Sequence, residues 1–160
     1  MNIEKSSSLK NLKLQGVRVG VVWARFNEKI TGSLLEGSRR ALLESGLKES
    51  EIDIFDVPGA FEIPLMAQSL AQSKKYAGII CLGAVIRGDT PHFDYVCKAA
   101  TEGILEAQLK TGIPMAFGVL TLNTMEQAIQ RSGPGNDNKG FEAGQVVVEM
   151  ILQLEKVKAI

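Results

Sequence analysis

The chain has 160 residues, the length of one ordinary domain. Its 18 Lys and Arg balance its 18 Asp and Glu, and 45% of its residues are hydrophobic. This composition is typical of a folded globular protein, and it argues against a basic nucleic-acid-binding protein and against a polybasic protein of membrane surfaces.

Residues 1–15 are expected to form a loosely ordered N-terminal arm. They carry a serine run and lysines without an apolar stretch, so we do not expect a secretory signal. No apolar run approaches the roughly 18 residues that a membrane span needs. The two cysteines, Cys81 and Cys97, form no CxxC pair, and the chain has one histidine. We therefore expect reduced, buried thiols and no metal site, in a cytoplasmic protein.

Four short apolar segments are predicted to be strands. The first is rich in β-branched residues and ends at a polar cluster, as a buried strand does. The third is apolar on both faces and is therefore expected to be central in a sheet. The four expected strands are residues 17–23, 51–57, 78–86 and 115–120.

Segments with helical periodicity alternate with these strands. In the first, apolar residues recur at helical spacing up to Gly46, which can cap a helix end. Pro64 falls in the first turn of the second, where a missing N–H costs little. Gly112 and Pro114 end the third. The five expected helices are residues 27–45, 61–74, 92–110, 124–131 and 141–156.

This alternation predicts an α/β sandwich in which a four-stranded parallel sheet carries helices on both faces. We expect one domain of this kind over residues 16–160. In such sheets, ligands bind beyond the carboxyl ends of the strands. The segments to inspect are therefore residues 25–27, 58–62, 87–92 and 121–123.

The common nucleotide-binding loops are not found at these positions. The first expected strand is not followed by the GxGxxG pattern of dinucleotide-binding folds. Residues 133–140 superficially resemble a phosphate loop, but Asn138 replaces its second glycine and Gly140 replaces the residue that coordinates Mg²⁺. That segment also lies between helices. We therefore exclude dinucleotide and nucleoside-triphosphate binding.

The segment 87–92 is the most informative. Thr90 is a favoured N-cap and Pro91 a favoured first helical residue, which places His92 in the first turn of a helix. The backbone N–H groups around residues 88–90 suit a phosphate or another anion. The helix dipole disfavours imidazolium, so His92 is expected to be neutral and able to accept a proton. A surface histidine without a task is the alternative, but the position beyond a central strand favours catalysis.

Other candidates are more ambiguous. Asp94 points away from His92 on a helix and is expected to complement the helix dipole. The carboxylate of Glu62 lies in an apolar setting and needs a polar partner, which a ligand hydroxyl could supply. Phe26 and Phe61 follow strand ends, where core packing is the alternative to stacking on a planar ligand.

Arg131 and Lys139 flank the turn-rich residues 133–138. A guanidinium binds phosphate bidentately and a lysine acts as a point charge. From the residues alone, a solvated helix end is the simpler interpretation of both.

Together and in order, these segments resemble the lumazine synthase family, which carries out the penultimate step of riboflavin biosynthesis. The resemblance runs from about Gly16 to the C-terminal helix. Residues 121–124 lack an acidic residue often seen there, and residues 133–137 differ from the loop of members that close into sixty-subunit shells. The matching segments are residues 25–27, 57–64, 83–94, 117–121 and 126–128, Arg131 and residues 138–140.

The resemblance implies a three-layer, flavodoxin-like fold. It implies condensation of 5-amino-6-(D-ribitylamino)uracil with 3,4-dihydroxy-2-butanone 4-phosphate to 6,7-dimethyl-8-ribityllumazine, with release of phosphate and water. The family uses no metal or organic cofactor. Its members are homo-oligomers, so we expect a pentamer, leave the shell open, and name riboflavin synthase as a candidate partner.

The resemblance also implies roles for individual residues. His92 would be the catalytic, proton-transfer residue. The ribitylaminouracil would be bound by Phe26, Ala60, Phe61, Glu62, Ala84, Val85, Ile86 and Phe117. The butanone phosphate would be bound by Asp89, Thr90, Arg131 and Lys139. Three of these, Phe117, Arg131 and Lys139, are expected to enter from the adjacent subunit.

Two alternative functions belong to other classes. A non-catalytic flavin- or lumazine-binding module could use the same pocket, but it would need no proton carrier such as His92. A flavodoxin-like regulatory domain would need clustered aspartates for phosphotransfer, whereas these strand ends offer Phe26, Phe61 and His92.

Overall fold

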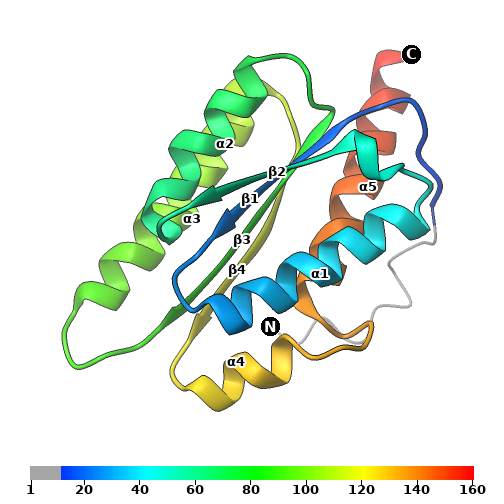
Figure 1. Ribbon diagram of the computed structural model, residues 1–160. Coiled ribbons are helices and arrows are strands. Elements are labelled where there is room, and N and C mark those ends of the chain that lie inside the picture. Colours follow the sequence, from blue (N-terminus) through cyan, green and yellow to red (C-terminus); the bar gives the residue numbers. More distant parts are fainter. Residues whose placement is uncertain (1–11) are drawn as a thin grey trace.

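The computed structural model describes residues 12–160, in which four parallel strands form one sheet in the order β2-β1-β3-β4. The interior strand β3 pairs with β1 on one side and with β4 on the other, as its apolar faces predicted. The predicted fold class, a three-layer α/β sandwich of the flavodoxin-like kind, is confirmed (Figure 1). The strands are β1 (Val19–Ala24), β2 (Ile52–Val57), β3 (Gly78–Ile86) and β4 (Met115–Leu122).

Helices cover both faces of the sheet. Figure 1 shows α1 and α5 on one face and α2 and α3 on the other, with α4 beyond the end of β4. Two short 3-10 turns, η1 and η2, precede β2 and α2. The helices are α1 (Glu28–Glu44), α2 (Ile63–Gln72), α3 (His92–Thr111), α4 (Met125–Arg131) and α5 (Lys139–Lys158), and the turns are η1 (Glu49–Glu51) and η2 (Ala60–Glu62).

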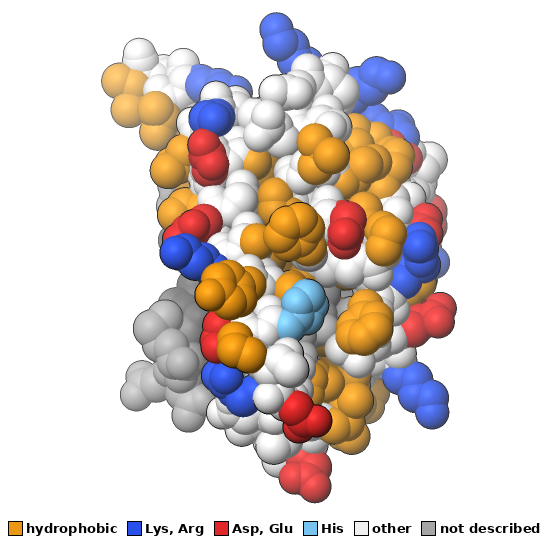
Figure 2. Space-filling view, turned by 90° about the vertical axis from the view of Figure 1, so that its left-hand side faces the viewer, with side chains coloured by type: hydrophobic (Ala, Val, Ile, Leu, Met, Phe, Trp, Pro, Cys, Tyr) orange, Lys and Arg blue, Asp and Glu red, His pale blue; other side chains and the backbone are white. Residues whose placement is uncertain are grey.

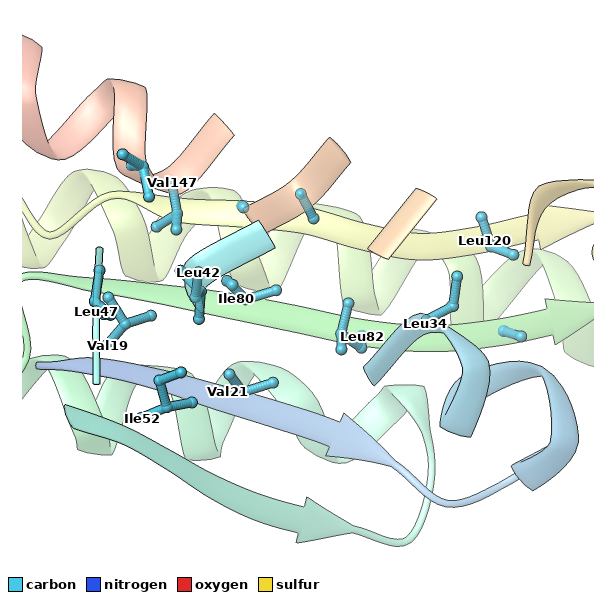
Figure 3. Packing of buried hydrophobic residues seen from close by; sticks show 14 of the residues in the cluster. Val19, Val21, Leu34, Leu42, Leu47, Ile52, Ile80, Leu82, Leu120 and Val147 are labelled. Carbon is cyan, nitrogen blue, oxygen red and sulfur yellow. The ribbon is translucent and has the colours of Figure 1, made fainter. Parts of the chain in front are cut away.

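Each face of the sheet has its own hydrophobic layer. Between the sheet and α1 and α5, side chains such as Val21, Leu42 and Ile80 are fully buried (Figure 3). The second layer, under α2 and α3, includes Ile63 and Ile79. Because both faces are covered, the inner strands β1 and β3 are mostly apolar, and the loops at the strand ends are the parts left open to ligands.

Some boundaries differ from those predicted, and local hydrogen bonds explain the difference. Helix α5 begins at Lys139 instead of residue 141, because the buried side chain of Asn138 accepts from the N–H groups of Gly140 (2.8 Å) and Phe141 (3.1 Å). Strand β4 continues to Leu122, two residues further than expected, because Leu122 still pairs with Ile86.

The approach of α5 to α1 depends on a glycine. A Cβ placed on Gly140 would overlap the carbonyl oxygen of Leu34, so no larger residue fits there. The side-chain amide of Asn138 also donates to the carbonyls of Ser33 (3.1 Å) and Gly133 (2.8 Å). These contacts explain the Asn138-Lys139-Gly140 motif as a structural anchor of the α4–α5 loop.

Residues 1–11 of the expected N-terminal arm lie outside the described residues. In the rest of the arm, Leu14 is buried and its N–H donates to the carbonyl of Ser45 (2.8 Å). The expectation that both thiols are buried is wrong for one of them. Of the two free thiols, Cys81 is buried, which raises its pKa to about 12, whereas Cys97 is only half-buried.

Within residues 12–160, no helix is long and apolar enough to cross a bilayer.

An ion pair between Arg18, just before β1, and Asp53, near the start of β2, should make the stability of the protein depend on pH. The carboxylate of Asp53 accepts hydrogen bonds from the guanidinium of Arg18 (2.8 Å) and the hydroxyl of Tyr76 (2.8 Å), and the Arg18 contact chiefly lowers the pKa of Asp53 below its usual 3.8. A lowered pKa in the folded state stabilises the protein above the unfolded-state pKa, and this contribution is lost as the pH falls through the folded-state value.

We therefore expect the stability advantage of the wild type over Asp53→Asn to shrink as the pH falls from about 6 to about 3. Urea unfolding at several pH values and fixed protein concentration measures it. A constant difference between the two proteins would contradict the assigned pairing.

Candidate active site

A cavity of about 560 Å³ opens at the carboxyl edge of the sheet. The β1–α1 loop, η2, the end of β3 and the start of α3 meet there, as the rule for parallel sheets predicts. The predicted site residues that line it are Phe26, Ala60, Phe61, Glu62, Ala84, Val85, Ile86, Thr90 and His92. The structure thus brings together residues from three strand ends that are far apart in the sequence.

Four further residues line the cavity: Gly59, Gly88, Phe93 and Val96. The sequence pointed to Gly88 only through its peptide N–H and gave no role to the other three. Gly59 lies inside the segment 58–62, so its position was the available signal. Phe93 and Val96 lie on α3, one residue and four residues after His92, and helical spacing could have placed Val96 on the same face as His92.

Four other predicted site residues do not line this cavity: Asp89, Phe117, Arg131 and Lys139. Phe117 lies on the edge strand β4 and is 48% exposed. The guanidinium of Arg131 donates to the carbonyl of Gln127 (3.0 Å) at the end of α4, and the ammonium of Lys139 pairs with Glu142 (2.9 Å). None of these contacts joins them to the cavity of their own chain.

Two aromatic side chains flank the cavity without being packed in the core. Phe26 is 71% exposed and Phe61 is 62% exposed. The simpler interpretation of both as core residues is therefore wrong. Large aromatic rings left open beside a cavity can stack on a planar molecule, and burial of each ring by such a molecule would be favourable.

Asn27, which lies in the segment 25–27 but received no role from the sequence, fixes the loop that carries Phe26. Its backbone is in the left-handed region, with φ 64° and ψ 51°, immediately before α1. Its side-chain amide donates to the carbonyl of Ala84 (2.9 Å) at the end of β3. The available signal was the residue type, because asparagine tolerates this conformation better than most residues. Asn27 thus ties two walls of the cavity together.

Replacing Asn27 tests both contributions. We expect Asn27→Ala to lower the free energy of unfolding by about 2 kcal/mol, since it loses the hydrogen bond and strains the left-handed backbone. Asn27→Gly relieves the strain and should lose only about 1 kcal/mol. Urea unfolding at fixed protein concentration compares them. An alanine variant as stable as the glycine variant would show that the backbone conformation is not the cause.

Glu62 is held at the cavity by its own turn. One carboxylate oxygen, Oε2, accepts the backbone N–H of Gly59 (3.0 Å), which closes η2. Oε1 accepts no hydrogen bond from any described residue. The carboxylate therefore has the polar partner that its apolar setting demanded, and an oxygen remains for a hydroxyl donor.

Helix α3 begins at His92, with Pro91 at the cap position, one residue later than the predicted capping by Thr90. The hydroxyl of Thr90 still accepts the N–H of His92, at 3.4 Å. The imidazole is exposed and makes no hydrogen bond to residues 12–160, while the carboxylate of Asp94 contacts Arg87 (3.4 Å). In Figure 2 the histidine, pale blue, lies at the surface among hydrophobic side chains.

The loop before His92 offers unused hydrogen-bond donors. The peptide N–H groups of Gly88, Asp89 and Thr90 donate to no other group in the described part of the chain. They precede the N-terminus of α3, a helix of 20 residues whose dipole is positive at this end. Such an arrangement can hold an anion such as a phosphate.

Comparison with known proteins places this geometry in context. Residues 16–155 match the family model described as 6,7-dimethyl-8-ribityllumazine synthase, a span that includes every element around the cavity. A curated protein of Desulfatibacillum aliphaticivorans, named 6,7-dimethyl-8-ribityllumazine synthase, is 50% identical over 147 residues. The aligned region covers 92% of this chain and 95% of that protein.

Proposed function

Because this chain belongs to the 6,7-dimethyl-8-ribityllumazine synthase family, we propose that the cavity at the carboxyl edge of its sheet is where the lumazine is made. The protein is a transferase of riboflavin biosynthesis. It condenses 5-amino-6-(D-ribitylamino)uracil with 3,4-dihydroxy-2-butanone 4-phosphate and releases phosphate and water. The observation that carries the site is one cavity that combines open aromatic rings, a carboxylate, a histidine and unused N–H donors.

The proposed uracil subsite uses the aromatic and backbone walls. Phe26 stacks on the pyrimidine ring, since its ring is exposed at the cavity. Backbone groups of residues 84–86 contact the polar edge of that ring. The ribityl chain lies along Ala60 and Phe61, where the free oxygen of Glu62 accepts a hydroxyl.

The proposed phosphate subsite lies at the start of α3. The N–H groups of residues 88–90 and the hydroxyl of Thr90 supply donors, and Asp89 lies in the same loop. This placement brings the ketone of the butanone phosphate near His92, which lines the same cavity.

The chemistry matches these residue types. The aromatic amine attacks the ketone, water leaves to give an imine, phosphate is eliminated, and a second attack closes the ring with loss of water. These steps need orientation, proton transfer and stabilisation of an anion, and they need no strong nucleophile. We assign the proton transfers to His92.

No lysine or arginine of residues 12–160 lines the cavity of its own chain, so none of them can pair there with the phosphate. We propose that Arg131, Lys139 and Phe117 enter from the adjacent subunit of a homo-oligomer. A pentamer is the proposed assembly, with the sixty-subunit shell and an association with riboflavin synthase as further possibilities to test.

The direct test mixes both substrates with the protein and follows lumazine fluorescence together with phosphate release. We expect equimolar appearance of the two products. Saturable binding of a flavin or lumazine without turnover would instead favour the non-catalytic binding module. Light scattering on the same sample measures the size of the assembly.

A further inference from the structure

Arg87 joins three parts of the chain at the rim of the cavity. Its guanidinium lies over the ring of Phe93, 4.4 Å from the centroid, and its Nε donates to the side-chain oxygen of Asn123 (2.9 Å). Its peptide N–H donates to the carbonyl of Leu122 (2.8 Å). A weaker contact, 3.4 Å, joins it to Asp94. The end of β3, the first turn of α3 and the end of β4 are thereby held together.

The side chain of Arg87 is outside the cavity, although its neighbours are not. Ile86, Gly88 and Phe93 line the cavity, and Arg87 is absent from its wall. The guanidinium therefore packs on a ring that itself forms part of the wall. A residue in this position can act on bound substrates only through the residues it holds.

His92 needs such support because its imidazole has no hydrogen-bond partner within residues 12–160. Its location is then set by its backbone, that is, by where α3 begins. The preceding loop is weakly held, since the N–H groups of residues 88–90 bond to nothing in the described chain. The contacts of Arg87 to Phe93 and Asn123 constrain the residues on either side of this loop.

We propose that Arg87 is a positioning residue for the proton carrier, acting by clamping the first turn of α3 to the end of β4; this rests on the proposed role of His92. The clamp depends on the guanidinium, which lies over the ring of Phe93 while its Nε donates to the side-chain oxygen of Asn123. The contact to Asp94 is exposed on both sides and contributes little. A lysine keeps the charge, but it has no planar group to lie over the ring and no Nε–H to donate to Asn123 at the same time.

The test is a double-mutant cycle on turnover. We expect Arg87→Met and Arg87→Lys each to lower kcat about tenfold while KM for both substrates changes less than about threefold, because displacement of a catalytic group costs rate more than binding. In the background of His92→Ala, Arg87→Met should cost no further rate, since the group it positions is gone. Arg39→Met is the matched control, because that exposed guanidinium pairs with Glu49 at the other end of α1 and should leave kcat unchanged.

The outcomes separate the two proposals. If His92→Ala alone left the rate unchanged, the proposed proton carrier would be wrong. If His92→Ala were slow and Arg87→Met still multiplied its loss tenfold in the double variant, Arg87 would act by another route and the positioning role would be refuted. Full activity of Arg87→Lys would also refute it, and circular dichroism of each variant shows whether the fold is retained.

Discussion

Replacing His92 with alanine should lower kcat about 100-fold, with a smaller change in KM. The imidazole lines the cavity at the positive end of α3 and is free of any hydrogen bond to the described residues, so it can exchange protons with bound substrates. The loss stays moderate because the cavity still holds the two reactants next to each other after the imidazole is removed. Stopped-flow or steady-state fluorescence of the lumazine product measures it.

One further variant and a chemical rescue sharpen this result. His92→Gln keeps a polar side chain of similar reach but cannot cycle a proton near neutral pH, so it should be nearly as slow as alanine. Free imidazole added to His92→Ala should restore part of the rate. Lys156→Ala is the control variant. Lys156 lies in the last turn of α5, away from the cavity, so this variant should keep the wild-type kcat. A loss below about threefold in His92→Ala would argue that another group transfers the proton.

Local sequence signals were sufficient for most of the fold. The bounds of β3 were predicted as observed because the apolar run is short, rich in β-branched residues, and bounded by Gly78 and Arg87. The start of α3 at His92 was predicted as observed because Thr90 and Pro91 restrict the backbone there, although the cap is Pro91 instead of Thr90. Strand β4 was predicted too short, since its pairing with Ile86 depends on a residue far away in the sequence. Helix α5 was also predicted too short, although the capping of Gly140 and Phe141 by Asn138 is a local signal that the sequence offered.

The site was predictable to the extent that it is built from loops at strand ends. Phe26, Glu62 and His92 were found because parallel sheets place such loops at one edge. The hydrogen bonds of Asn27 to Ala84 and of Arg87 to Asn123 join residues 57 and 36 positions apart, and no local pattern encodes them. The exposure of Phe26 and Phe61 could not be predicted either, because composition does not say which aromatic side chains pack in the core.

The position of Arg131 leads to the second large effect. We expect Arg131→Ala to lower kcat/KM for the butanone phosphate about 10- to 100-fold, the usual value of hydrogen bonds to a charged group. Arg131→Lys should recover part of this loss, because it restores charge without the bidentate geometry. Steady-state kinetics with varied butanone phosphate and saturating 5-amino-6-(D-ribitylamino)uracil separates the two variants.

Whether Arg131 serves its own cavity or a neighbouring one is decided by hybrid oligomers. In its own chain the guanidinium bonds to the carbonyl of Gln127 and is not part of the cavity wall. If the neighbour's cavity receives it, co-expression of His92→Ala with Arg131→Ala should restore about a quarter of the wild-type activity, because a head-to-tail contact then pairs an intact histidine with an intact arginine in one case of four. Co-expression of Arg131→Ala with the double variant His92→Ala/Arg131→Ala is the control and should restore nothing. Hybrids no more active than either parent would place Arg131 outside the neighbouring cavity and leave the phosphate to the loop before α3.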